Sequence, residues 1–404
     1  MTSNPGIVER SAGPLIFLMA GESSGDAIGA RLMSALKRET NGDVRFAGIG
    51  GERMSAEGLT SDFPMEELSV MGLTEVLPRI PLILRRIRET ASRIEALHPA
   101  AVVSIDASGF CGRVEKRVKR KRLGIPLIRY VAPMVWAWRP WKAKESARFL
   151  DHIMTLLPFE PPYFEKEGLP ATFVGHPVIE EGAEQGDGGR FRARHGIPAS
   201  APLLALLPGS RRGEIARLLP RFAETVERLT TEWPNLHVVI ATVDTVAESV
   251  ASRTASWPMP VVIVRSANEK YDAFAAANAA LAASGTVSLE LALARCPMVI
   301  AYRINFITAA ILRVFLMRVR YATLVNVMLN RPVIPEFLQF ACRPERLTEA
   351  VGKLLRDPEA RRAQIDAVRP ALHALGMDGS PPSTRAARTV LRVIAEKTKQ
   401  PSMA

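Results

Sequence analysis

Short apolar runs alternate with amphipathic stretches along most of the chain. Most of these runs are apolar at every position, which is typical of parallel strands that are covered on both faces. They predict strands at 14–20, 44–49, 101–105, 126–131, 152–157, 203–207, 236–241, 260–264, 279–283 and 297–301. Helix-like spacing of apolar residues fills intervals between them, at 26–39, 85–97, 214–232, 271–277 and 286–294. This alternation predicts an α/β fold with doubly wound parallel sheets.

The alternation stops at 181–200, a stretch with five glycines, many charges and no strand-like run. We predict an inter-domain linker there. On either side of it the chain starts with an apolar strand, a Gly/Ser turn and a helix, as LIFLMAGESSGD and LLALLPGSRRGE. The expectation is two Rossmann-like domains facing a cleft, at 1–180 and 201–375, followed by a helical tail at 376–404.

Composition narrows the class of protein. With 404 residues, 48% of them hydrophobic and 23% charged, the chain has enough apolar residues for two packed domains and is not a disordered protein. Its three cysteines are too few and too scattered for a disulfide framework or a cysteine zinc site. There is no apolar run long enough to span a membrane, and polar GESSGD directly follows the run 15–21, which favours a buried strand over a signal peptide. We therefore expect a cytoplasmic protein.

The net charge of +12 is concentrated in three stretches. Residues 113–122 include seven basic residues and one acidic residue, 79–93 include five and one, and 291–335 include six basic residues and no acidic one. Such clustering predicts an anionic partner: a nucleic acid, a phosphorylated substrate or an anionic membrane face. Solvated helix faces are the alternative.

Three turns at predicted strand ends carry candidate chemistry. GESSGD (21–26) matches neither a dinucleotide fingerprint nor a phosphate loop, and its Glu22 suits hydroxyl groups or an incoming alcohol. PGSRRGEI (208–215) and SGTVSLEL (284–291) place small residues at helix starts, where N–H groups bind anions, and Arg211 adds a charged contact to phosphate. On neighbouring strands these two turns would converge on a diphosphate, with Glu290 accepting from ribose hydroxyls. Simple helix caps are the alternative, with Asp26 serving the helix N-terminus in the first turn.

Two further residues end apolar runs. Asp106 follows 101–105 at the strand edge where such folds bind ligands, so it is a candidate general base or else a helix cap. His176 is either an acid, base or phosphate partner or a residue that packs in a turn. Neither DxD, HxxxH nor a cysteine pair occurs, so we expect no metal site.

Three segments combine apolar and basic residues. VWAWRPW (135–141) fits a stacking platform for nucleic acid, an interfacial patch or a helix packed in its own core. Segments 65–97 and 304–320 place large apolar side chains beside arginines, which is typical of a protein lying on an anionic leaflet. Core helices are the alternative.

Ten motifs occur in order across about 14–345: AGESSGD, GIGGERM, MEELSVMG, VWAWRP, LLPFEPPYF, FVGHPV, LLPGSRRGEI, SGTVSLELAL, PMVIAYR and VIPEFLQ. In this order they closely resemble the lipid-A-disaccharide synthase family, glycosyltransferases of the GT-B fold. The resemblance implies transfer of the sugar of UDP-2,3-diacylglucosamine to 2,3-diacylglucosamine 1-phosphate (lipid X) in lipid A biosynthesis, giving a β(1→6) disaccharide 1-phosphate and UDP. Together with the charge pattern it predicts a peripheral protein on the inner face of the cytoplasmic membrane, without a cofactor or a nucleic-acid partner, and it leaves a homodimer open.

The resemblance also assigns roles to residues. It implies Asp106, Glu22 and Arg211 as catalytic residues, and the following as substrate-binding residues: Ser23, Asp26, Gly209, Ser210, Glu214, Ser284, Gly285, Thr286, Glu290, Asn326, Glu336 and Gln339. Where the family has A-P-D-F after Asp106 and S-P-S before VWAW, this chain has 107–110 as ASGF and 132–134 as APM. Both departures fall on the acceptor side and bear on acceptor or acyl-chain preference.

The expected mechanism is an inverting, metal-independent transfer. The acceptor 6-hydroxyl attacks the anomeric carbon while Asp106 takes its proton. Arg211 and the helix N-termini after Gly209 and Gly285 stabilise the leaving UDP. Two rival interpretations are a UDP-sugar epimerase or hydrolase on the same scaffold, and a non-catalytic nucleic-acid-binding protein.

Overall fold

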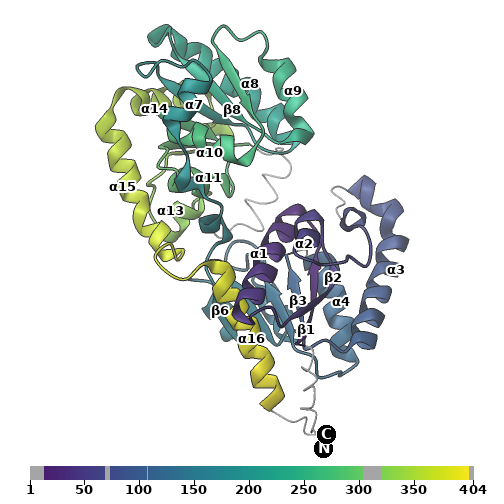
Figure 1. Ribbon diagram of the computed structural model, residues 1–404. Helices are drawn as coiled ribbons and strands as arrows, with labels where there is room; N and C mark the ends of the chain where they lie inside the picture. The colour runs from purple at the N-terminus through teal and green to yellow at the C-terminus, as the bar shows by residue number, and fades with distance from the viewer. Residues whose placement is uncertain (1–12, 69–72, 107, 304–319, 400–404) are drawn as a thin grey trace, which may run out of the picture. The chain divides into compact units, whose positions relative to one another are not determined.

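The computed structural model describes residues 13–68, 73–106, 108–303 and 320–399 (Figure 1). The chain forms two compact units: the first is Met1–Pro177 with Gly379–Ala404, and the second is Val178–Asp378. The C-terminal segment therefore returns to the first unit. Each unit is a parallel α/β sheet with helices, as predicted.

The first unit is built on six parallel strands in the order β2-β1-β3-β4-β5-β6. The strands are β1 Leu15–Ala20, β2 Arg45–Ile49, β3 Ala101–Ile105, β4 Leu127–Tyr130, β5 His152–Thr155 and β6 Ala171–Phe173. Its helices are α1 Ser23–Glu39, α2 Glu52–Ala56, η1 Met65–Glu67, α3 Leu73–Leu97, α4 Ser108–Arg120, α5 Trp141–Ala147, α6 Pro161–Glu165 and α16 Pro382–Lys399.

Both faces of this sheet are buried, which explains why its strands lack polar alternation. Phe17 and Met19 of β1 face a core shared with α3 and α4, whereas Ile16 and Leu18 face a second core beneath α1 and α16. Each fully buried side chain of this size contributes about 1.5–3 kcal/mol relative to its exposed state. The continuous apolar pattern of 14–20 is thus the signature of a strand inside three layers.

The second unit has six parallel strands in the order β12-β11-β10-β7-β8-β9. The strands are β7 Leu203–Leu207, β8 His237–Ala241, β9 Val261–Val264, β10 Ala279–Ala282, β11 Met298–Tyr302 and β12 Glu336–Leu338. Its helices are η3 Ala183–Gln185, α7 Gly188–Arg194, α8 Arg212–Glu232, α9 Asp244–Thr254, α10 Ala267–Ala276, α11 Val287–Leu293, α13 Leu324–Leu329, η4 Gln339–Ala341, α14 Pro344–Arg356 and α15 Pro358–Ala374, while η2 Pro177–Glu180 lies at the junction.

All ten predicted strands are present, with bounds shifted by at most two residues. The hydrophobic pattern does not predict β6 and β12, three-residue strands at sheet edges whose residues are only half-buried. It also left α4, α9, α14 and α15 unassigned. Short edge strands carry too few apolar residues to produce a recognisable run.

The units divide at other positions than the sequence pattern indicated. Residues 181–200 are not a free linker, because they form η3 and α7 and belong to the second unit. Phe191 is buried, and Arg190 pairs with Asp272 of α10 at 2.7 Å. The helical tail is confirmed as α16, but it packs on α1 of the first unit through buried Ala386, Ala387 and Val390.

Candidate functional site

In the first unit, the turn after β1 and the residue after β3 meet at the point where the strand order reverses. These strands pair in register, with Ala20 opposite Ile105. The GESSGD turn and Asp106 therefore lie side by side at the carboxyl edge, where doubly wound sheets bind ligands. Gly25 permits the close approach, because a Cβ there would lie 3.3 Å from the Ile105 carbonyl oxygen.

Two successive strand ends at this edge have left-handed backbone conformations. Asp106 has φ +52° and donates its N–H to the Tyr130 carbonyl oxygen at 3.1 Å. Val131, which follows β4, has φ +75°, a conformation that a β-branched residue rarely adopts. Such strain costs about 1–3 kcal/mol per residue and concentrates at functional sites. The half-exposed Asp106 is thus held in a specific position at the sheet edge.

The three polar residues of the GESSGD turn are not equivalent. Glu22 and Ser23 are exposed at the start of α1. Asp26 is buried, and its carboxylate accepts the N–H groups of Gly51 at 2.7 Å, Arg53 at 3.0 Å and Met54 at 3.1 Å. These bonds hold the N-terminus of α2, so Asp26 serves the end of a helix other than its own. The geometry favours a positioning role for Asp26 over direct contact with substrate.

Glu160, a buried residue of the LLPFEPPYF motif, follows β5 and has no role assigned from the sequence. Glu160 accepts the indole N–H of Trp136 at 3.0 Å and the backbone N–H groups of Leu157 at 3.0 Å and Leu156 at 3.2 Å. Trp136 also packs edge-on against Phe159. Glu160 thereby fixes the VWAW segment that follows β4. Burial raises the pKa of the Glu160 carboxyl to about 7.

This pKa predicts a pH dependence of stability. Because the folded protein holds the Glu160 proton more tightly than the unfolded chain, this group makes the wild type lose stability as pH rises from about 5 to 8. Glu160→Gln cannot ionise, so its free energy of unfolding relative to wild type should increase by about 1–3 kcal/mol between these pH values. Urea unfolding of both proteins at pH 5 and pH 8 measures the difference. Equal pH dependence of the two proteins would contradict the assignment.

In the second unit, the two predicted turns lie on neighbouring strands. β7 and β10 pair directly, with Leu207 opposite Ala282, at the reversal point of the strand order. The turns 208–211 and 284–286 follow these strands at the same edge. β11 and β12 extend the same edge outward, and Gln339, with φ +52°, directly follows β12 at the outside of the sheet. The strand pairing confirms that the two turns follow neighbouring strands.

A glutamate in the first turn of α8, Glu214, stabilises the turn after β7. Ser210 donates its N–H to the Glu214 carboxylate at 3.2 Å. Gly209 has φ +110°, and a Cβ there would lie 2.5 Å from the same carboxylate, so only glycine fits. Arg211 precedes α8 with its side chain 64% exposed, 3.8 Å from Glu214. Glu214 therefore shapes the turn, and the exposed guanidinium of Arg211 remains able to reach a ligand.

The turn after β10 presents small residues at the start of α11. Gly285 and Thr286 are exposed, and Ser284 donates to the Ala322 carbonyl oxygen at 3.1 Å. Glu290 lies one helical turn into α11. It is nearly buried and forms an ion pair with Lys270 of α10 at 2.6 Å. Sequence reasoning missed Lys270, because nothing in its local sequence identifies the partner of Glu290.

Asn326 and Glu336 act on the backbone of their own segment. The Glu336 carboxylate accepts the N–H groups of Ala322 and Thr323, each at 2.8 Å, and the Asn326 amide at 2.7 Å. Asn326 is fully buried and bonds both N–H and carbonyl of Ile334. Together they fix the residues that lead into α13. Ala322, in this lead-in, accepts the hydrogen bond from Ser284 of the turn after β10. The hydrogen bonds of Asn326 and Glu336 thus hold the backbone of this segment, with Asn326 buried and Glu336 half-buried.

One remaining candidate is a buried histidine, and one candidate segment falls outside the described residues. His176 is buried, which lowers the pKa of its imidazole to about 4 and keeps it neutral. The segment 304–319 lies outside the described residues. Within the described ranges, no group of His, Cys, Asp and Glu side chains could hold a metal ion, and no helix is long and apolar enough to cross a membrane.

Two doubly wound parallel sheets, each with ligand-type turns at its reversal point, define the GT-B class of α/β proteins. Solved structures share this fold: UDP-GlcNAc 2-epimerase from Neisseria meningitidis bound to UDP-GlcNAc has TM-score 0.61 at 11% identity, covering 95% of this chain and 100% of that one. MurG from Acinetobacter baumannii has TM-score 0.56 at 15% identity, covering 96% and 100%.

Sequence comparison assigns the family. The model of the lipid-A-disaccharide synthetase family matches residues 16–379. Lipid-A-disaccharide synthases from Rhodospirillum centenum and Paramagnetospirillum magneticum are 56% and 53% identical, covering 95% and 96% of this chain and 95% and 99% of their own. The chain belongs to the lipid-A-disaccharide synthase family and is a glycosyltransferase of lipid A biosynthesis.

Proposed function

We propose that the chain joins UDP-2,3-diacylglucosamine to lipid X by an inverting, metal-independent transfer in which the second unit holds the donor and the first unit the acceptor. The observation that carries this division is the pair of anion-type turns on adjacent β7 and β10, the first of which carries the exposed guanidinium of Arg211. The first unit instead offers a strained carboxylate, Asp106, beside Glu22 and Ser23.

The donor side must stabilise the leaving UDP. The exposed guanidinium of Arg211 and the N–H groups that begin α8 and α11 are preorganised donors, which lower the barrier where negative charge develops. Glu290 is the acceptor for ribose hydroxyls, and Lys270 holds its carboxylate through the 2.6 Å ion pair. Glu214, Asn326 and Glu336 keep the turns in place.

The acceptor side must remove a proton. Asp106 is the general base for the attacking 6-hydroxyl, and Glu22 and Ser23 orient the sugar through its hydroxyl groups. General-base help of this kind contributes roughly 10²–10⁴ in rate. Asp26 contributes indirectly, because it fixes the loop and helix beside the same turn.

Purified protein given radiolabelled lipid X and UDP-2,3-diacylglucosamine tests the proposal. We expect a labelled disaccharide 1-phosphate that forms only when both substrates are present. Unchanged lipid X, from a folded protein at saturating donor, would overturn the proposal.

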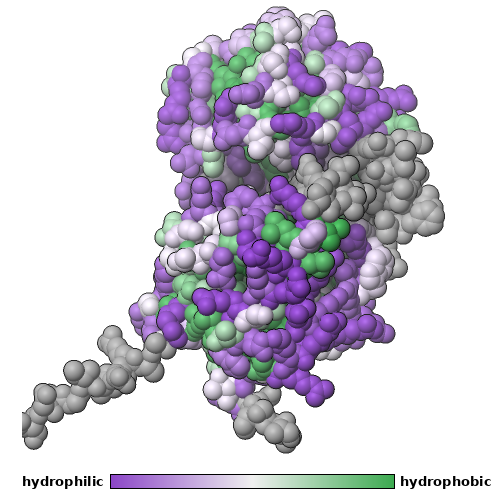
Figure 2. Space-filling view, turned by 90° about the vertical axis from the view of Figure 1, so that its right-hand side faces the viewer, coloured by the Kyte–Doolittle hydropathy of each residue, from purple (hydrophilic) through white to green (hydrophobic). Residues whose placement is uncertain are grey.

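We also propose a cytoplasmic protein that binds peripherally to the inner face of the membrane through α3. Ile87, Ala91 and Ile94 of this helix are core residues, whereas Ile80 and Leu84 are 40% and 49% exposed. Figure 2 faces the side of the first unit on which α3 lies, where hydrophobic residues gather among hydrophilic ones. An exposed apolar group beside arginines supports insertion into an anionic leaflet.

The arginines of α3 are not all available to lipid. Arg86 pairs with Glu67 at 2.7 Å and with Glu89 at 2.9 Å, and Arg85 pairs with Glu89 at 2.7 Å. Replacing the exposed apolar side chains of α3 is therefore a more specific test of membrane binding than replacing its arginines.

Replacing both Ile80 and Leu84 with serine should weaken sedimentation with phosphatidylglycerol vesicles by about tenfold or more, because two large side chains no longer leave water. Neither substitution touches the core, whereas serine at the partly packed Ile83 would. Val243→Ser, at an exposed apolar residue of the second unit, is the matched control. Wild-type binding by the double variant would place the membrane contact elsewhere.

A further inference from the structure

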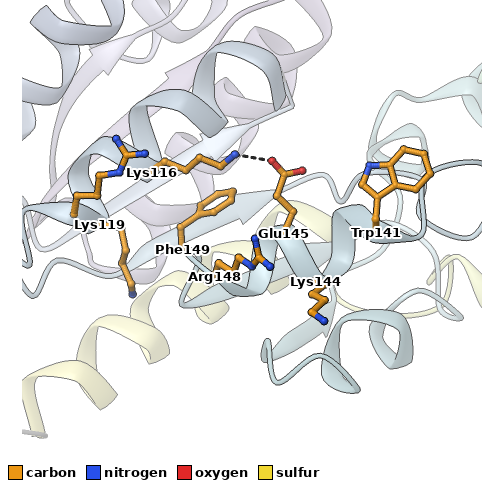
Figure 3. A pocket seen from close by; sticks show the side chains of 8 residues that line it. Lys116, Lys119, Trp141, Lys144, Glu145, Arg148 and Phe149 are labelled. Carbon is orange, nitrogen blue, oxygen red and sulfur yellow. Dashed lines mark hydrogen bonds and ion pairs between the residues drawn. The ribbon is translucent and has the colours of Figure 1, made fainter.

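A basic groove lies between α4 and α5 of the first unit, on helix surfaces that the proposed transfer does not use (Figure 3). It has a volume of roughly 630 Å³ and is lined by Lys116, Lys119, Arg120, Trp141, Lys144, Glu145, Arg148 and Phe149. Five of these eight residues are cations and one is an anion. Three of the cations come from the basic run 113–122 and Trp141 ends the tryptophan-rich segment 135–141, two motifs without an assigned role, whereas the other four lining residues follow at 144–149.

The negative charge of the groove is already neutralised. Glu145 pairs with Lys116 at 2.6 Å, the contact drawn in Figure 3, and with Lys142 at 2.7 Å. These two lysines lower the pKa of Glu145 to about 2. Among the described residues, the side chains of Arg120, Lys144 and Arg148 have no hydrogen-bond or ion-pair partner. The groove therefore has an excess of positive charge that no carboxylate of the described chain offsets.

A second hollow of roughly 190 Å³ continues the groove toward the start of α4, since both are lined by Lys116, Glu145 and Phe149. Arg129 lines this hollow and is 3% exposed. It pairs with buried Glu115, but its Nε atom has no hydrogen-bond partner among the described residues. Gly112 lies beside this guanidinium, since a Cβ there would be in ordinary van der Waals contact with it at 3.5 Å. An unsatisfied buried guanidinium N–H is an independent indication of an anionic ligand.

The rim and the floor of the groove favour a lipid over a nucleic acid. Trp141 is 55% exposed, and Met134, in the segment that leads into α5, is 51% exposed. A strand of nucleic acid needs several exposed aromatic faces for stacking, but Phe149 is only 5% exposed, so Trp141 is the single exposed ring of the lining. An amphipathic indole beside cations is typical of a side chain that lies at the level of lipid headgroups.

We propose that the α4–α5 groove binds the phosphate of an anionic lipid headgroup at the bilayer surface, with Arg148, Lys144 and Lys116 on the phosphate and Trp141 against the glycerol and upper acyl region. The lining of the groove lies on α4, on α5 and just after α5, apart from the turns and strand ends assigned to sugar transfer. The smaller hollow, in contrast, reaches the acceptor-side segments 107–110 and 132–134 through Gly109 and Pro133. The groove is also distinct from the apolar surface of α3, because it recognises headgroup charge.

The test compares the full-length wild type with a variant that carries Lys144→Glu and Arg148→Glu, both at surface positions outside the core. Sedimentation with vesicles of phosphatidylcholine alone and with 30% phosphatidylglycerol measures how much the anionic lipid strengthens binding. We expect the variant to lose at least tenfold in affinity for the anionic vesicles and to bind phosphatidylcholine vesicles like wild type. A second variant with the milder changes Lys144→Gln and Arg148→Gln should also lose affinity for anionic vesicles, but by a smaller factor. It keeps the test valid if the charge-reversed variant does not fold.

The matched control is Arg346→Glu with Arg362→Glu, two exposed arginines of α14 and α15 that change the net charge equally. This control should retain affinity for anionic vesicles within about twofold. Soluble glycerol 1-phosphate, added at millimolar concentration, should compete with the vesicles for the wild type only. The proposal is wrong if the groove variants bind anionic vesicles like wild type, if the control loses as much, or if single-stranded RNA binds the groove more tightly than the vesicles do.

Discussion

Replacing Asp106 with asparagine should lower kcat by roughly 10²–10⁴-fold, the usual contribution of a general base. The KM for the UDP-sugar should stay near the wild-type value, because the donor turns belong to the other unit. Asparagine suits this test, since it keeps the shape of the side chain and tolerates φ +52° better than other residues.

Steady-state kinetics with both substrates varied gives the two constants separately. The variant's thermal unfolding should match that of the wild type, which separates lost chemistry from lost structure. Glu22→Gln tests the same edge of the sheet and should affect the KM for the acceptor more than kcat. A kcat for Asp106→Asn within threefold of wild type would remove Asp106 from the mechanism.

Replacing Arg211 with alanine should lower the turnover rate by about 10²-fold or more, as the loss of one preorganised donor does elsewhere. The side chain is 64% exposed and shares only a 3.8 Å contact with Glu214, so its removal should leave the fold intact. Arg211→Lys should recover part of the rate, because lysine keeps the charge but loses the forked contact to phosphate.

Arg228→Ala is the matched control for this variant. Arg228 lies on the same helix, α8, and pairs at the surface with Glu224 and Glu345. Its loss should leave the rate within twofold of wild type. If Arg211→Ala were as active as this control, the leaving-group role of Arg211 would be excluded.

The fold was predictable wherever burial shaped the sequence over several residues. β1 and β7 lie inside their units, and every position of 16–20 and 203–207 is buried, so no polar alternation obscures them. β12 has three half-buried residues, and its identity depends on pairing with β11, which no local pattern shows. The charged stretch 181–200 resembled a linker because its compensating partner, Asp272, is far along the chain.

The site was predictable as a set of turns but not as a set of roles. A turn after an apolar strand can be recognised locally, and the strand order then places the turns after β7 and β10 together. The partners that define the roles of Asp26, Glu336 and Glu290 lie at least 25, 10 and 20 residues away along the chain, and only the folded chain brings them close. The spacing of polar residues therefore identifies candidates without separating those that contact substrate from those that hold the backbone.

The most direct test of sugar transfer is the amount of UDP released with and without the acceptor. Wild-type protein and UDP-2,3-diacylglucosamine are incubated with and without lipid X, and UDP and the disaccharide 1-phosphate are quantified over time. The account predicts one UDP for each disaccharide when lipid X is present, and almost none when it is omitted. UDP release at a similar rate without lipid X, or an isomerised UDP-sugar without disaccharide, would show a hydrolase or epimerase and contradict it.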